Sequence, residues 1–203
     1  MSSAIEPQST DDQLFLAIGE FFVTFSHLIS ITEFLTATLI SKGGDNDAYK
    51  RARIAVSNFT AQPLSNAFFA LIKEFESQSW TDNDQAIVKR ARKELDSLIA
   101  QRNRFAHDTW HLGHPNLPRP TPDSWHRIRT LGTQSAGLLV EFGTVTTGQI
   151  KRLINETKRI DANIRQLALA GIAGDTSRPE LHLHILSDES GERVVSLIRN
   201  ANG

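Results

Sequence analysis

The sequence predicts a mainly α-helical fold, a bundle of four to five helices with a small β-hairpin insertion. Two observations carry this prediction. Apolar residues recur at three- to four-residue spacing over several long segments, and residue patterns typical of helix N-termini open three of these segments. Only residues 125–130 and 137–143 favour a pair of short strands within the body of the chain.

The first predicted helix covers residues 11–42. It begins at "TDDQ", where Gln13 follows Thr10 by three residues as in a capping box, and it ends at "KGG". Its apolar stripe is too wide for a surface helix that packs on one neighbour. We therefore expect this helix to be central, or to bury a second face against another subunit.

Further helices follow along the chain. A second helical region runs from residue 47 to about 78, with a break near 59–63 because Pro63 is poorly tolerated inside a helix. The segment "SWTDND" is a cap region, and a third helix covers about 82–109. The segment "HPNLPRPTPD" contains four prolines and predicts a loop. The capping-box pattern "TTGQ" then opens a helix over about 147–170.

These elements define the expected domain organisation. Residues 1–10 form a flexible N-terminus and residues 11–172 form one helical domain, which is an ordinary size for a domain in a chain of 203 residues. Residues 173–203 form a C-terminal tail, whose alternating first half predicts either a β-hairpin or an arm that contacts a partner.

The composition excludes several classes of protein. Hydrophobic residues make up 39% and charged residues 22%, enough apolar side chain for a core, so global disorder is excluded. The absence of cysteine excludes disulfides and thiolate metal sites and suits a reducing cytoplasm. The longest uncharged apolar stretch, "FFVTFSHLISIT", is shorter than the roughly 20 residues that span a bilayer. We expect a cytoplasmic protein without membrane contact.

Charge is unevenly distributed although the net charge is −1. Residues 1–41 contain five acidic residues and no lysine or arginine. Residues 89–104 contain six basic and two acidic residues. This basic segment favours contact with phosphate, and it makes Lys93 and Arg104 candidate substrate-binding residues. The alternative is a helix face that is simply solvated.

An arginine interrupts the apolar line of the third helix. That line consists of Val88, Ala91, Leu95, Leu98, Arg102 and Phe105. A guanidinium on a core-facing line is costly unless it is paired or borders a wet cleft. Glu20 on the first helix is a candidate partner that would support Arg102 as a buried carboxylate, and a surface position for Glu20 is the alternative.

The segment "QRNRFAHDT", residues 101–109, combines groups suited to RNA cleavage. Arg102 can hold a phosphate through two hydrogen bonds, Asn103 can orient a phosphate oxygen or an imidazole, and His107 can transfer a proton near neutral pH. Asn103 and His107 share a helix face, whereas Arg102 and His107 lie about 140° apart. Only a reaching arginine, or a symmetry mate, would bring these two side chains together.

Other histidines could in principle bind a metal. His107, His111 and His114 are spaced as possible ligands, but the segment runs off a helix end without a cysteine or an acid cluster. We therefore expect loop histidines, no metal and no other cofactor. His182 and His184 share one strand face, for which a solvated strand is the favoured interpretation.

Two tryptophans flank the proline-rich loop. Trp110 and Trp125 are favoured as anchors of this loop to the helices, because buried aromatic rings contribute large apolar contact. The alternative is that Trp110 binds substrate by stacking on a base.

The motif and its setting resemble the HEPN domain superfamily. The segment "RNRFAH" matches the Arg-x(4–6)-His signature of that family, with the usual polar residue directly after the arginine. The motif closes a long helix and is followed by a bulky "DTW", a short β insertion and a final helix. The first helix with "FSHL" is similar to bacterial HEPN-like proteins. The resemblance covers about residues 12–170.

The resemblance implies a helical bundle that forms a homodimer, with both copies of the motif in one cleft. It implies a metal-independent endoribonuclease, often a toxin or a phage-defence effector, with a possible antitoxin or regulatory partner. Arg102 would bind and stabilise the phosphate, Asn103 would polarise or orient, and His107 would be the general acid–base. In the toxin branch neutralised by a nucleotidyltransferase a tyrosine stands where this chain has Thr109.

A second hypothesis is a non-catalytic helical binding or regulatory dimer, because some HEPN proteins have lost nuclease activity. The two hypotheses differ in what they require of the motif. The nuclease needs both motif copies accessible in a shared basic cleft, whereas the structural role needs Arg102 buried against a carboxylate.

Overall fold

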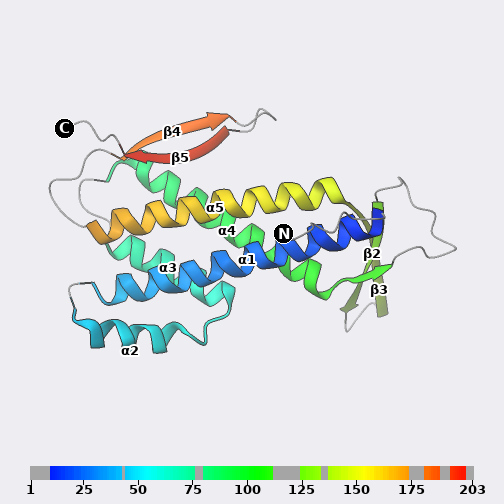
Figure 1. The fold of residues 1–203 in the computed structure, drawn as a ribbon, viewed down its shortest axis with the longest axis horizontal. Coiled ribbons are helices and arrows are strands. Elements are labelled where there is room, and N and C mark those ends of the chain that lie inside the picture. Colours follow the sequence, from blue (N-terminus) through cyan, green and yellow to red (C-terminus); the bar gives the residue numbers. More distant parts are fainter. Residues whose placement is uncertain are drawn as a thin grey trace, which may run out of the picture. The chain divides into compact units, whose positions relative to one another are not determined.

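A computed structural model describes residues 10–42, 44–75, 80–111, 124–133, 137–173, 181–187 and 193–199. In this part of the chain the predicted mainly helical fold is confirmed, with five helices and a small three-stranded antiparallel sheet (Figure 1). The helices are α1 (Thr10–Ile40), α2 (Asn46–Val56), α3 (Ala61–Glu74), α4 (Asp82–His107) and α5 (Thr147–Ala173). The strands are β1 (Thr109–His111), β2 (Ser124–Thr133), β3 (Gly137–Thr146), β4 (Leu181–Ser187) and β5 (Arg193–Arg199).

Local sequence signals explain where two of the long helices begin. Before α4, the Asp84 side chain accepts from the backbone N–H of Thr81 (2.8 Å), and the Thr81 hydroxyl accepts from the N–H of Asp84 (3.3 Å). Before α5, Thr146 and Gln149 make the same reciprocal pair at 2.9 and 3.1 Å. These capping boxes satisfy N–H groups that lack helical partners, and they confirm both predicted cap regions.

The predicted break in the second helical region is confirmed. α2 ends at Val56 and α3 begins at Ala61, which places Pro63 in the first turn of α3. Proline is tolerated there because the first N–H groups of a helix have no intrahelical acceptor. The predicted end of this region at about 78 was wrong, because α3 ends at Glu74.

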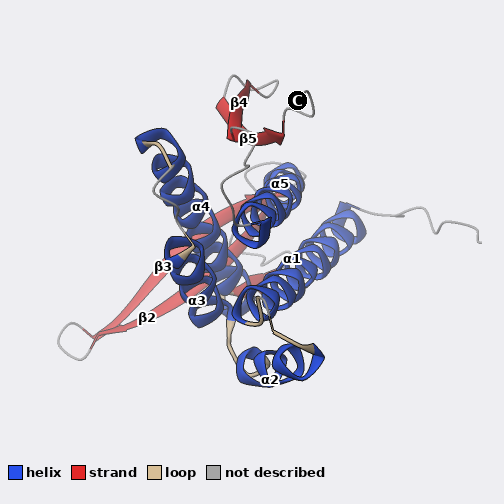
Figure 2. Ribbon diagram, turned by 90° about the vertical axis from the view of Figure 1, so that its left-hand side faces the viewer, coloured by secondary structure: helices blue, strands red, loops and turns tan. Residues whose placement is uncertain are grey.

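The predicted hairpin is present and longer than expected, and a third strand joins it. β2 pairs with β1 on one side and with β3 on the other, all antiparallel. The long β2–β3 ribbon is visible in Figure 2. The sequence predicted helix to residue 109, but α4 ends at His107 and Thr109 already pairs with Ile128. Strand pairing takes over the backbone hydrogen bonds that the helix would otherwise have used.

By their internal contacts, the residues form two compact units. The first unit comprises residues 1–26 and 100–157, and the second comprises residues 27–99 and 158–203. α1, α4 and α5 each contribute residues to both units. The predicted helical domain over 11–172 therefore includes parts of each.

The first unit has an aromatic core around the sheet. Trp125 of β2 is fully buried, and its indole N–H donates to the Asp11 carboxylate at 2.8 Å, which ties the start of α1 to the sheet. Phe21 packs against Phe105 with ring centroids 5.6 Å apart. Other buried members of this core are Leu14, Ala17, Phe25, Val145, Ile150, Leu153 and Ile154.

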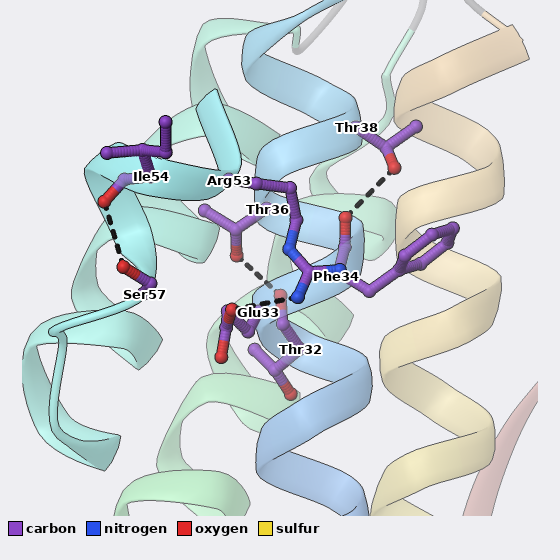
Figure 3. Close-up of polar contacts among 8 residues, drawn as sticks. All are labelled: Thr32, Glu33, Phe34, Thr36, Thr38, Arg53, Ile54 and Ser57. Carbon is purple, nitrogen blue, oxygen red and sulfur yellow. Dashed lines mark hydrogen bonds and ion pairs between the residues drawn. The ribbon is translucent and has the colours of Figure 1, made fainter. Parts of the chain in front are cut away.

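In the second unit, α2 packs against the C-terminal part of α1 (Figure 3). Tyr49, the only tyrosine of the chain, makes an edge contact with Phe34 at 6.0 Å between centroids. Arg53 reaches across to Glu33, with the closest N–O distance at 3.5 Å. Ala37, Ala52 and Val56 form the apolar contact beneath. Small side chains at this contact let the two helices approach closely.

α1 combines a buried face with an exposed apolar one. By length and composition it could cross a membrane, a property shared by core helices of soluble proteins and by signal sequences. Only 28% of its most apolar segment is buried, and Phe15, Leu16, Val23, Phe34 and Ile40 are exposed. The burial of a second face against another subunit stays a prediction, and these exposed residues are its candidates.

The C-terminal tail contains β4 and β5, which pair as an antiparallel two-stranded sheet. Leu181 lies opposite Arg199 and Ser187 lies opposite Arg193. The side chains of His182 and His184 lie outside the described part of the structure.

Gly171 allows a close contact within the second unit. A Cβ atom at this position would lie 3.0 Å from Leu39 Cδ2 and 3.3 Å from Ile72 Cδ1. Lys42 also approaches here, because its ammonium donates to the Gly171 carbonyl at 2.9 Å and lies 4.6 Å from the Phe75 ring centroid. The absence of a side chain at residue 171 therefore matters for packing.

We expect Gly171→Val to lower the free energy of unfolding by about 1–3 kcal/mol through overpacking. Gly148→Val, on the same helix, should change it by less than about 0.5 kcal/mol, since the nearest atom to a Cβ there is 3.7 Å away. Urea denaturation of both variants tests this. Equal stability of the two would contradict the close contact at Gly171.

Candidate functional site

α4 places the residues of the motif on different faces of its last turns. Leu95, Leu98 and Phe105 are buried, which confirms the predicted core-facing line. Arg102 lies on this line and is half-buried, whereas Asn103 is exposed. The arginine is therefore placed where the sequence pattern predicted, at the boundary between core and solvent.

The Arg102 guanidinium lies on aromatic rings of α1. Its Cζ atom is 5.5 Å from the Phe22 ring centroid and 5.7 Å from that of Phe25. Its Nη1 atom donates to Asn103 Oδ1 at 3.3 Å, and its Nε atom is buried without a hydrogen-bond partner among the described residues. One side of the guanidinium is therefore desolvated while its outer end remains close to the surface.

This environment holds the charge of Arg102 without neutralising it. Aromatic faces attract a guanidinium electrostatically but do not cancel its positive charge. Among the described residues, no carboxylate forms the ion pair with Arg102 that the structural hypothesis requires. Glu20 is exposed on α1, and its support of Arg102 stays a prediction. A guanidinium in this state is suited to binding an anion at its outer end.

The other polar residues of the motif face solvent. Asn103, Arg104 and His107 are exposed, and His107 is the last residue of α4. Asn103 and His107 share a face, as the spacing predicts. The structure shows no contact between Arg102 and His107, in agreement with their angular separation of about 140° on a helix. A site that uses both groups on one phosphate therefore needs either movement or a second copy of the chain.

Trp110 follows the motif on β1 and closes the end of α4. Its indole N–H donates to the Phe105 carbonyl at 3.1 Å, and the two ring centroids are 5.3 Å apart. The bond satisfies a carbonyl in the last turn of the helix, which lacks an intrahelical donor. These contacts favour the anchoring interpretation of Trp110. Its stacking on a base, and substrate binding by Arg104 and Lys93, stay predictions; both basic residues are exposed, and Lys93 belongs to the second unit.

Two residues beside the motif, Asp108 and Arg127, were not predicted from the sequence. Asp108 follows His107, is buried, and binds Arg127 of β2 with 3.1 Å between Oδ2 and Nη1. A signal for Arg127 was present in the sequence, because residues two apart on a strand share a face and Trp125 is buried. An arginine on the inward face of a strand needs a buried partner.

Of His107, His111 and His114, only His107 has a side chain in the described part of the structure. The side chain of His111 and the whole of His114 lie outside the described residues. Among the described side chains, no group of three or more histidine, aspartate or glutamate residues is placed to hold a metal ion.

Comparison of the chain with family models, curated proteins and solved structures found no match. The resemblance of "RNRFAH" to the HEPN signature therefore depends on the motif and its setting in this chain alone.

Because the Arg102 side chain packs on the rings of Phe22 and Phe25, we expect the protein to fold without the charge of Arg102. Arg102→Met keeps an unbranched side chain over both rings and removes a buried N–H without a partner, so the free energy of unfolding should change by less than about 1 kcal/mol. Arg102→Ala should cost about 1–2 kcal/mol through lost packing. Thermal and urea denaturation measure both. A loss of about 3 kcal/mol or more in Arg102→Met would instead indicate a buried charged partner.

Proposed function

We propose that this protein is a metal-independent endoribonuclease of HEPN type, acting as a homodimer. The observation that carries the proposal is the environment of Arg102, whose guanidinium lies over the rings of Phe22 and Phe25 and has no carboxylate partner in the part of the chain that the structure describes. The exposed Asn103 and His107 on the same helix end supply the remaining groups that phosphodiester cleavage needs.

The roles follow from the chemistry of each side chain. Arg102 binds the phosphate and stabilises the charge that grows on it during attack. Asn103, which accepts a hydrogen bond from Arg102, orients the guanidinium and a phosphate oxygen. His107 takes the proton of the ribose 2′-OH, which attacks the adjacent phosphorus, and returns it to the departing 5′-oxygen. The products are a 2′,3′-cyclic phosphate and a 5′-hydroxyl end.

The separation of Arg102 and His107 supports a site shared between two copies of the chain. In the first unit, α1 buries Leu14, Phe21 and Phe25 but leaves Phe15, Leu16 and Val23 exposed at 53%, 59% and 71%. Exposed apolar side chains gathered on one face are typical of protein interfaces. Positions 16 and 23 are seven residues apart and share a helix face. We assign this face to the second copy, and we propose that the two copies combine Arg102 of one chain with His107 of the other.

A second function is favoured by the packing of Arg102. An arginine seated over two phenylalanine rings also contributes apolar contact through its side chain, as a purely structural arginine does. The chain would then be a non-catalytic helical binding or regulatory dimer. Arg102→Met separates the two functions, because it keeps the packing and removes the phosphate-binding charge.

The resemblance implies a biological setting that belongs to the same proposal. It comprises a cytoplasmic location, a role as a toxin or defence effector, and an antitoxin or other regulator as partner. The departure at Thr109 argues against control by tyrosine modification next to the motif, since the chain has its single tyrosine at position 49.

We expect the protein to cleave a labelled mixed-sequence RNA in the presence of EDTA. Both His107→Ala and Arg102→Met should lower kcat/KM by at least about 100-fold, because each removes a group that acts in the transition state. His27→Ala is the matched control, an exposed histidine of the second unit that should keep full activity. Analysis of the product ends tests for 2′,3′-cyclic phosphate.

Two results would contradict the proposed nuclease activity. One is the absence of EDTA-resistant cleavage by the wild-type protein under any salt condition that permits RNA binding. The other is cleavage that survives His107→Ala, since the activity would then come from another group or from a contaminant.

The shared site predicts complementation between two inactive variants. A heterodimer of Arg102→Met and His107→Ala chains, isolated with two different tags, contains one intact site of two and should show about half of the wild-type activity. An inactive heterodimer would place Arg102 and His107 of one site in the same chain.

The interface itself is tested by Val23→Glu, which should convert the dimer to a monomer in light scattering because it places a charge in the apolar face. Ile54→Glu is the control, since Ile54 is equally exposed at 72% but lies on α2. A wild-type protein that is monomeric at high micromolar concentration would contradict the assigned face.

A further inference from the structure

The end of α4 passes into the sheet with a single intervening residue. His107 is the last helical residue, Asp108 follows it, and Thr109 begins β1 and pairs with Ile128 of β2. The backbone N–H of Asp108 still bonds to the Arg104 carbonyl at 2.9 Å. The position of His107 therefore depends on the helix before it and on the attachment of Asp108 to the sheet after it.

The Asp108 carboxylate makes this attachment. Its side chain is only 3% exposed, and Oδ2 lies 3.1 Å from Nη1 of Arg127. The second oxygen, Oδ1, is buried and has no partner among the described residues. A buried carboxylate with one cationic partner depends strongly on that partner, because loss of the cation leaves a charge in a poorly solvated place.

Arg127 reaches Asp108 from the middle of a cross-strand row. Its Cα lies opposite Trp110 of β1 on one side and opposite Gly143 of β3 on the other. A Cβ atom at position 143 would lie 2.8 Å from Arg127 Nε and 3.3 Å from its Cγ. The Arg127 side chain therefore lies across the backbone of β3, and any larger residue at position 143 would require this side chain to shift.

We propose that Asp108, Arg127 and Gly143 form a positioning unit that fixes the end of α4 and thereby the place of the His107 imidazole. Gly143 provides the space for Arg127, Arg127 holds Asp108, and Asp108 directly follows His107 in the chain. These are positioning residues, since they act on His107 through the helix end and take no part in the chemistry proposed above. Their effect on catalysis rests on the proposed nuclease, whereas their effect on the helix end does not.

Gly143→Ala is the decisive variant, because it displaces Arg127 without changing the motif, Asp108 or any charge. Gly148→Ala is the control, since a Cβ there meets no atom closer than 3.7 Å. Amide hydrogen exchange at Asp108 should rise about 10- to 100-fold in Gly143→Ala, with exchange at Leu95 unchanged. In cleavage assays kcat should fall about 100-fold while KM stays within about threefold, as expected for a misplaced catalytic group.

A second series tests the same unit through its charge. Arg127→Lys keeps a cation and should lose less than Arg127→Gln in both measurements. Unchanged exchange at Asp108 in Gly143→Ala overturns the positioning unit. So does raised exchange with wild-type kcat in an active enzyme, since His107 would then not depend on the helix end.

The two proposals can fail separately. If the wild-type protein does not cleave RNA, the nuclease fails, and the positioning unit is judged from Asp108 exchange and the NMR signals of the His107 imidazole. Changed exchange together with shifted His107 signals supports the unit in that case. Unshifted signals overturn it.

Discussion

The charged guanidinium of Arg102 lies on the core-facing line of α4. The candidate site depends on how this charge is accommodated there. Leu98 and Phe105 on this line are buried, so the line cannot simply be turned toward solvent to hydrate Arg102. Phe22 and Phe25 instead cover one side of the guanidinium with their aromatic rings. The charge is tolerated and remains available, which a carboxylate partner would not allow.

The sheet of the first unit has a function beyond adding strands to a helical protein. β1 receives the chain directly from α4, Trp110 satisfies the Phe105 carbonyl, and Arg127 binds Asp108. Asp108, Thr109 and Trp110 directly follow α4. They are fixed by a buried ion pair, by backbone pairing and by an indole hydrogen bond, respectively. Rigid support of this kind is what the proton transfer proposed for His107 would require.

α1 links the site to the question of assembly. One face of α1 contributes Phe21, Phe22 and Phe25 to the core and to the ring contacts of Arg102. The other face exposes Leu16 and Val23 to solvent. Phe22 and Val23 are adjacent in the sequence, so a partner bound on the exposed face would lie close to the rings that contact Arg102. Assembly through this face and the chemistry of Arg102 would therefore be physically coupled.

The features that follow from the sequence alone are those that depend on near neighbours. Helical periodicity, the capping boxes at Thr81 and Thr146, the break before Pro63, and the place of Arg102 on an apolar line follow from contacts three or four residues apart. The side chains that meet across the chain become known only from the fold, as when Arg102 contacts Phe22 and Phe25, or Asp108 contacts Arg127. Residue spacing carries no information about these pairings, because they depend on how separate elements pack and on where the strands align.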